Sequence, residues 1–139
     1  MFKIRQIDHV VLRVVDVESM MKFYMDVLGC GLEKVQASAG LYQLRAGTSL
    51  IDLIPVDGKL GRLGGAAPGA QARNLDHFCL SIEPFDGNSL LEYLRAKGYE
   101  AGPVESRYGA EGEGPSIYVN DPEGNVVELK GPPWGTAND

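Results

Sequence analysis

Residues 117–130 read IYVNDPEGNVVELK and predict two strands joined by a tight turn. The β-branched and aromatic residues on either side of the turn favour strands. Between them, Pro122 sets φ for a turn and Gly124 accepts a positive φ without steric cost. Glu128 interrupts the apolar residues of the second strand. If its side chain faces inward, this carboxylate needs a partner, because burying an unpaired charge is very costly.

The composition is that of an ordinary globular protein. The chain has 139 residues, 44% of them hydrophobic and 23% charged, which predicts one domain with its own core. A net charge of −6 argues against a nucleic-acid partner. No apolar run approaches the roughly 18 residues of a membrane span. The N-terminus has no signal-peptide core, so we expect a cytoplasmic protein without membrane contact. Cys30 and Cys79 are expected to be small buried hydrophobic side chains.

The order of predicted elements repeats along the chain. The segments IDHVVL (7–12) and LDHFCL (75–80) open two strands, and each strand is followed by a helix. We expect helices over 17–28 and 86–97, and further strands over 32–37, 41–46 and 49–56 in the first half and 99–105, 115–120 and 125–130 in the second. The interpretation is an α+β fold of two βαβββ repeats in a single domain (1–139), with repeat 1 over about 5–56, a flexible connection over 57–74 and repeat 2 over 75–131.

The repeat also pairs four side chains that can bind a metal ion. His9 and His77 are the only histidines, and both stand at the third residue of an opening strand. Asp52 and Glu128 both stand between apolar residues of a closing strand. Imidazole and carboxylate ligands without thiolate suit Zn, Ni, Co, Mn or Fe(II). Four protein ligands leave two positions open on an octahedral ion for a substrate with adjacent oxygens. The side chain of Asp52 is one methylene shorter than that of a glutamate, so Asp52 binds the ion directly, through water or not at all.

Substrate contacts are predicted from the segment before the seventh strand. Residues 107–114 are rich in glycine, and we expect either a mobile rim over the site or an exposed loop with solvated charges. Arg107 and Tyr108 are the candidate substrate-binding residues. The planar fork of Arg107 suits a carboxylate group.

These motifs together resemble a known family. From Ile7 to Gly131 the sequence resembles the vicinal oxygen chelate superfamily, which comprises glyoxalases, bleomycin-resistance proteins and extradiol dioxygenases. The features that carry the resemblance are HVVL at 9–12, Phe23-Tyr24 with Leu28-Gly29, His77, and DPEGNVVEL at 121–129. The sequence is most similar to small glyoxalase-domain proteins that resemble lactoylglutathione lyase. The resemblance implies a cupped mixed sheet around a metal ion, commonly in a homodimer.

The resemblance also implies roles for individual residues. His9, His77 and Glu128 fit the metal positions of the family. Asp52 stands where the glyoxalase I branch has a glutamate that binds the metal and helps to move a proton, so the chain departs from that pattern here. A metal site within one subunit and a site across a dimer interface are both compatible with the sequence.

Three activities compete. The preferred one is a metal-dependent lyase or isomerase of the glyoxalase type, in which Glu128 or Asp52 moves a proton between adjacent carbons of a small substrate. The first alternative is an extradiol-type Fe(II) dioxygenase; it would need a tyrosine in place of a further histidine, with Tyr42, Tyr108 and Tyr118 as candidates. The second alternative is a thiol transferase of the fosfomycin-resistance kind or a drug-binding resistance protein.

Overall fold

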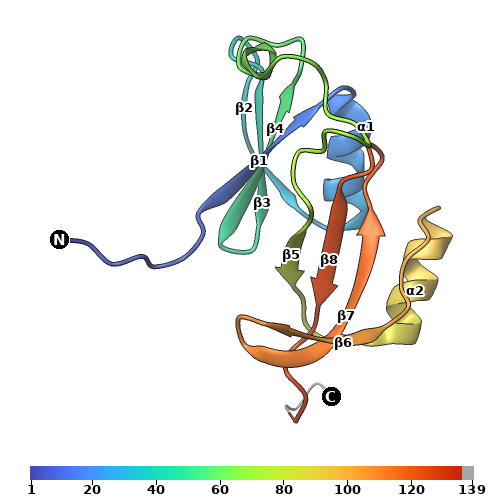
Figure 1. Ribbon diagram of the computed structural model, residues 1–139. Helices are drawn as coiled ribbons and strands as arrows, with labels where there is room; N and C mark the ends of the chain where they lie inside the picture. The colour runs from blue at the N-terminus through green and yellow to red at the C-terminus, as the bar shows by residue number, and fades with distance from the viewer. Residues whose placement is uncertain (136–139) are drawn as a thin grey trace. The chain divides into compact units, whose positions relative to one another are not determined.

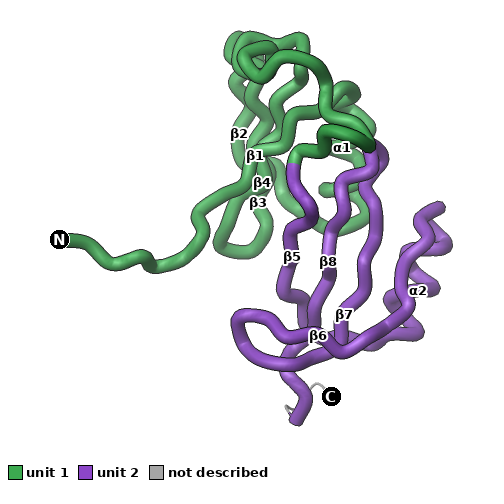
Figure 2. The backbone as a smooth tube through the Cα atoms, viewed as in Figure 1, with its two compact units in different colours: residues 1–74 green, residues 75–139 purple. Residues whose placement is uncertain are grey.

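The computed structural model describes residues 1–135 and divides the chain into two compact units (Figures 1 and 2). Unit 1 comprises residues 1–74, and unit 2 begins at Leu75. Each unit contains a four-stranded sheet of its own. No helix among the described residues combines the length and the apolar character that a membrane crossing requires.

Unit 1 has the order β-α-β-β-β. Its sheet has the strand order β1-β4-β3-β2, in which β1 runs parallel to β4 and the other neighbours are antiparallel. The elements are β1 (His9–Val14), α1 (Val17–Lys22), a π-helical turn η1 (Phe23–Val27), β2 (Gly31–Gln36), β3 (Leu41–Ala46), β4 (Ser49–Pro55) and a 3₁₀ turn η2 (Gly61–Gly64).

Unit 2 repeats this topology. Its strand order is β5-β8-β7-β6, again with the first and last strands of the unit parallel to one another. The elements are β5 (Phe78–Ser81), α2 (Gly87–Ala96), β6 (Glu105–Gly109), β7 (Gly112–Asn120) and β8 (Val126–Lys130). The α+β fold with two βαβββ repeats is therefore confirmed. That the two units make one domain with the predicted boundaries stays a prediction.

The helices form where the sequence predicts them. The carboxylate of Asp16 caps α1 by accepting the Ser19 N–H at 3.2 Å, and Asp86 caps α2 by accepting the Ser89 N–H at the same distance. Gly29 follows η1 with φ of 86°, as expected for a residue that ends a helix. The apolar side chains of the first helical segment, Met20, Phe23, Tyr24 and Val27, are buried, as are Leu12, Val14, Leu44, Ile51 and Leu53 on one face of the sheet in unit 1.

The second strand of repeat 2 differs from the prediction. A strand over 99–105 is wrong, because Gly102 has φ of 91° and Pro103 has no N–H to donate. The glycine-rich residues 107–114 instead form a β-hairpin from β6 into β7. Gly114 must be glycine there, since a Cβ would lie 2.7 Å from the carbonyl oxygen of Pro132. Glycine marks a close backbone approach at this position. The loop expected in both alternatives is therefore a β-hairpin, and a rim over the site stays a prediction.

The connection after β4 is also more ordered than predicted. The Arg13 guanidinium donates to three backbone carbonyls of this segment, those of Gly61, Gly65 and Ala66, at 3.0, 2.6 and 2.9 Å. Asn74 then pairs with the backbone of Arg13 through both its amide oxygen and its amide nitrogen. The connection is therefore hydrogen-bonded to β1 in its first half and at its last residue, and its flexibility stays a prediction.

Candidate metal site

In unit 1 the predicted pair is formed by β1 and β4. The parallel register sets Val11 opposite Asp52, so His9 and Asp52 share one face of the sheet. His9 Nε2 lies 4.0 Å from Asp52 Oδ2, and His9 Nδ1 lies 2.7 Å from Asp8 Oδ1. Asp52 is only 3% exposed, and the Gln43 side-chain amide donates to its two oxygens at 3.3 and 3.4 Å.

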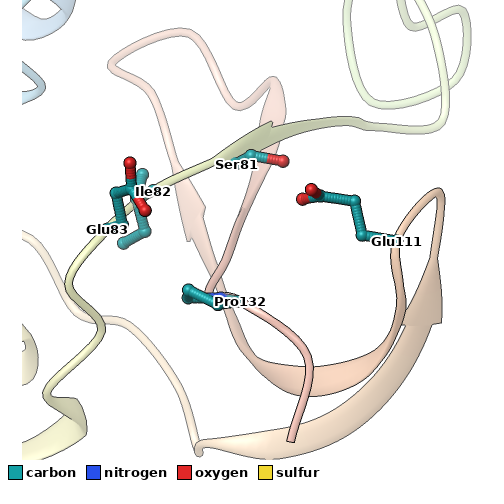
Figure 3. A pocket seen from close by; sticks show the side chains of 5 residues that line it. All are labelled: Ser81, Ile82, Glu83, Glu111 and Pro132. Atoms are coloured by element: carbon teal, nitrogen blue, oxygen red, sulfur yellow. The ribbon is translucent and has the colours of Figure 1, made fainter. Parts of the chain in front are cut away.

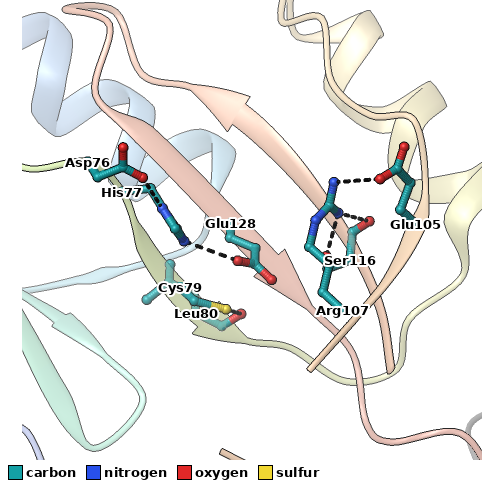
Figure 4. Close-up of polar contacts among 8 residues, drawn as sticks. All are labelled: Asp76, His77, Cys79, Leu80, Glu105, Arg107, Ser116 and Glu128. Carbon is teal, nitrogen blue, oxygen red and sulfur yellow. Dashed lines mark hydrogen bonds and ion pairs between the residues drawn. The ribbon is translucent and has the colours of Figure 1, made fainter. Parts of the chain in front are cut away.

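Unit 2 contains the equivalent pair at shorter range. Cys79 stands opposite Glu128, so the register between β5 and β8 matches that of unit 1. His77 Nε2 lies 3.3 Å from Glu128 Oε1, while His77 Nδ1 lies 2.6 Å from Asp76 Oδ2 (Figure 4). Tyr118 pairs with Glu128 across the sheet, and its ring packs edge-on against the His77 ring at 5.4 Å.

Charge and burial perturb two groups at these pairs. The hydrogen bond to Asp8, reinforced by the charge of Asp52, raises the pKa of His9 above its usual value. Desolvation by neighbouring protein atoms, together with the charge of Glu128, raises the pKa of the Cys79 thiol to about 11. The Cys79 residue is nevertheless accessible to solvent and Cys30 is half-buried, so the expectation of two fully buried cysteines is wrong.

The donor set of each pair fits a divalent metal ion. In both units the Nδ1 atom of the histidine is engaged by the preceding aspartate, while Nε2 faces a carboxylate on the neighbouring strand. Histidines that bind metals are commonly oriented in this way by a carboxylate on the other ring nitrogen. Each unit supplies one imidazole and one carboxylate. Within residues 1–135 no group of three or more histidine, cysteine, aspartate or glutamate side chains is placed to hold an ion.

The predicted substrate residues separate onto two faces of β6. The Arg107 guanidinium donates to Ser116 (Figure 4). It also stacks on the Tyr118 ring, 4.3 Å from the ring centroid. Tyr108 alternates to the opposite face and is 79% exposed, so it lies away from Arg107. Tyr42 stands opposite Leu53 in β3 and so lies on the other face from Asp52. Of the three tyrosines considered for acid–base chemistry, only Tyr118 shares a face with a histidine–carboxylate pair.

Sequence reasoning missed a small pocket in unit 2. It has a volume of about 200 Å³ and lies at the end of β5 remote from His77. Its lining, shown in Figure 3, comes from the end of β5, the β6–β7 turn and the segment after β8: Ser81, Ile82, Glu83, Glu111 and Pro132. These segments are distant in sequence and share no motif, so the sequence holds no signal for this pocket.

The sequence profile of the Glyoxalase/Bleomycin resistance protein/Dioxygenase superfamily matches residues 6–129. The chain belongs to this superfamily. The virulence protein STM3117 of Salmonella typhimurium is 33% identical over 131 residues, which are 91% of this chain and 83% of that protein. An integron cassette protein from the mobile metagenome of V. cholerae has a similar structure, with a TM-score of 0.73, 26% identity, and coverage of 94% of this chain and 98% of that one.

Two further solved structures share the fold at lower identity. Lactoylglutathione lyase from Agrobacterium tumefaciens is 22% identical, with a TM-score of 0.65 and coverage of 94% and 97% of the two chains. TnmS3, an antibiotic-binding protein from Streptomyces sp. CB03234, is 20% identical, with the same TM-score and coverage of 95% and 99%. One of these two proteins with the same fold is thus named as an enzyme, and the other as a binding protein.

Proposed function

We propose that this chain is a metal-dependent enzyme of the glyoxalase type, a lyase or isomerase acting on a small substrate with adjacent oxygens. The observation that carries the proposal is the repeated pair: a histidine held by the preceding aspartate and aimed at a carboxylate on the next strand. A single such pair is common in proteins. Its recurrence at one register in both repeats favours a shared chemical purpose over two independent structural contacts.

The proposed ligands are His9, His77 and Glu128, with Asp52 as a ligand or a catalytic base. A bound divalent ion, whether Zn, Ni, Co, Mn or Fe(II), would supply a Lewis acid that polarises a carbonyl group. Asp8 and Asp76 hold the imidazoles with Nε2 available for coordination. Glu128 is almost fully buried and lies beside His77 and Tyr118. In this proposal Glu128 or Asp52 takes a proton from one carbon of the substrate and returns it to the next.

Metal analysis tests the ligand set. Protein purified without added metal is analysed for bound elements, and affinities are measured by calorimetry for the native chain, His77→Ala, Glu128→Gln and Asp52→Asn. We expect losses of about a hundredfold in the first two variants and about tenfold in Asp52→Asn. Glu92→Gln on α2, an exposed carboxylate, is the matched control and keeps native affinity. Unchanged metal content in His77→Ala and Glu128→Gln would contradict the proposed metal site.

Substrate assays test the reaction class. Thioester formation from methylglyoxal and glutathione supports the lyase reaction, and its loss in Glu128→Gln under metal concentrations that saturate this variant assigns the proton transfer. Oxygen uptake with catechols would instead support the dioxygenase alternative, for which Tyr118 is the tyrosine placed beside His77. Ligand binding without any bound metal would favour a binding protein. Homodimer formation and a cytoplasmic location stay predictions.

A further inference from the structure

Lys130 is a cation with a largely covered side chain, and the site described above has no use for it. It closes β8 two residues after Glu128, so both side chains lie on the same face of the sheet in unit 2. The residue is only 6% exposed. Among the described residues its ammonium group forms no hydrogen bond or ion pair, and the glutamates of the neighbouring pocket, Glu83 and Glu111, form none with it. No buried side-chain nitrogen or oxygen of the described residues is without a hydrogen-bond partner, so the unpaired ammonium group reaches solvent while its aliphatic stem is covered. An accessible cation without a counter-ion is open to an anionic ligand.

The surrounding backbone is shaped to make room for this side chain. Lys130 extends over two glycines: a Cβ on Gly109 would lie 3.0 Å from its Cε atom, and a Cβ on Gly114 would lie 3.1 Å from its Nζ atom. A Cβ at either position would require the end of the lysine side chain to shift by a few tenths of an ångström. The end of the Lys130 side chain therefore packs against the backbone of the β6–β7 hairpin at two glycines that have no side chains.

The neighbours of Lys130 are donors of hydrogen bonds. Register places Ser81 on one side of it and Ser116 on the other. The Ser116 hydroxyl accepts from the Arg107 guanidinium at 2.6 Å, which leaves its own O–H available to donate. The partners of Lys130 across the sheet are thus two hydroxyl groups and no carboxylate.

Arg107 adds a second cation on this face. Its guanidinium is oriented by the Ser116 contacts and by stacking on Tyr118, and the side chain is 22% exposed. Its ion pair with Glu105, at 3.2 Å, involves a carboxylate that is 58% exposed, and exposed pairs of this kind contribute little free energy. The guanidinium is therefore positioned in advance while its counter-ion is readily exchanged for another anion.

We propose that Lys130 and Arg107 bind an oxyanion group, a carboxylate or a phosphate, of the substrate. The proposal rests on the proposed function, because the same substrate is taken to bind the metal through its adjacent oxygens. Successive residues on one face of a strand are about 7 Å apart, so the oxyanion lies a few bonds from the oxygens beside Glu128. The substrate class is then a small anionic compound whose charged group is separate from its chelating oxygens.

Titration of the metal-free full-length protein tests this assignment. Inorganic phosphate and acetate are added separately and followed by calorimetry and by backbone amide shifts of β7 and β8; metal is removed because phosphate would also bind to it. We expect saturable binding that weakens about tenfold or more in Lys130→Met and by a smaller factor in Arg107→Gln. Lys34→Met, an exposed lysine on β2, is the matched control and leaves binding unchanged. The tighter of the two ions identifies the oxyanion.

The outcomes separate this proposal from the metal site. Lys130→Arg retains the charge and should retain binding, which protects the test against a loss caused by misfolding of Lys130→Met. Absence of saturable binding to the native chain, or an equal loss in Lys34→Met, overturns the anion site. His77→Ala should lose metal affinity and keep phosphate binding. Metal binding without phosphate binding refutes only the inference about Lys130, and the reverse result refutes only the metal proposal.

Discussion

The two units of this protein have the same strand order and the same register, yet they place different side chains at equivalent positions. Each has a histidine, a preceding aspartate and a facing carboxylate. The histidine-to-carboxylate distance is 4.0 Å in unit 1 and 3.3 Å in unit 2. Around this common pair unit 1 has Val11, Gln43 and Ile54, where unit 2 has Cys79, Tyr118 and Lys130.

This difference shows that the topology determines the position of a residue in the sheet but does not determine which type of side chain stands there. Unit 2 has gathered the aromatic ring, the thiol and the two cations beside its pair. The two cations on the same face of unit 1 have other partners: Arg13 fastens the segment after β4, and Arg45 pairs with Glu33 at 3.1 Å. Unit 2 is therefore the half in which we expect substrate specificity, and unit 1 the half in which the pair is supported by structure.

The largest expected effect tests the fastened segment of unit 1. A Cβ on Gly61 would lie 1.8 Å from the carbonyl oxygen of Pro55, and a backbone group cannot yield as a flexible side chain can. Gly61→Ala should lower the free energy of unfolding by about 3 kcal/mol, measured by urea denaturation. Gly69→Ala, in the same segment with open space around it, is the control and should change stability by less than about 0.5 kcal/mol. Equal stability of both variants would mean that the segment is not held against β4.

An intermediate effect tests what the two units share. Asp8→Ala and Asp76→Ala should each lower metal affinity about tenfold, because each removes the carboxylate that orients a histidine. Asp8→Asn and Asp76→Asn retain an acceptor oxygen and should lose less. Calorimetry gives the affinities, and nitrogen NMR of the metal-free rings reports whether the Nδ1–H form is lost. A native tautomer with native affinity in the alanine variants would contradict the orienting role.

The smallest expected effect tests where the two units differ, at the position of Cys79 in unit 2 and Val11 in unit 1. With the pKa of Cys79 raised to about 11, only about one thiol in a thousand is ionised at pH 8. Alkylation of metal-free protein should therefore be slow at pH 8 and accelerate as the pH rises toward 11. Glu128→Gln removes a negative charge that raises this pKa, so the reaction should become a few times faster. A Cys30→Ser background confines the measurement to Cys79, and alkylation at the rate of an unperturbed thiol would refute this account.

Much of the architecture follows from local signals in the sequence. Asp16 and Asp86 cap two helices that the sequence predicts, and the matched openings of the two strands reveal the repeat. The shared register of Asp52 and Glu128 was likewise predicted from the repeat and from the turn before Glu128. These features could be predicted because each depends on residues that are close in sequence or that recur at a fixed spacing.

The features that were missed depend on contacts distant in sequence. The glycine-rich sequence around Gly114 is typical of a loop. A glycine is needed in β7 at this position because the backbone of Pro132 lies close to it. A lysine at the end of a strand is usually solvated. The side chain of Lys130 is covered because it lies over Gly109 and Gly114 in the hairpin of β6 and β7. The partners of Arg13 are backbone carbonyl groups. Every residue has such a group, so no residue type in the sequence marks these partners. Sequence patterns do not record partners of these kinds.

The parallel pairing of first and last strands has a consequence for how each half of the site is assembled. His9 and Asp52 are separated by nearly the whole of repeat 1, and so are His77 and Glu128 in repeat 2, yet each pair lies on adjacent strands. Neither pair can form unless the final strand of its repeat lies between two earlier strands of the same sheet. Each histidine therefore meets its carboxylate only when a contact across nearly the whole repeat has closed, which costs more loop entropy than a hairpin contact does.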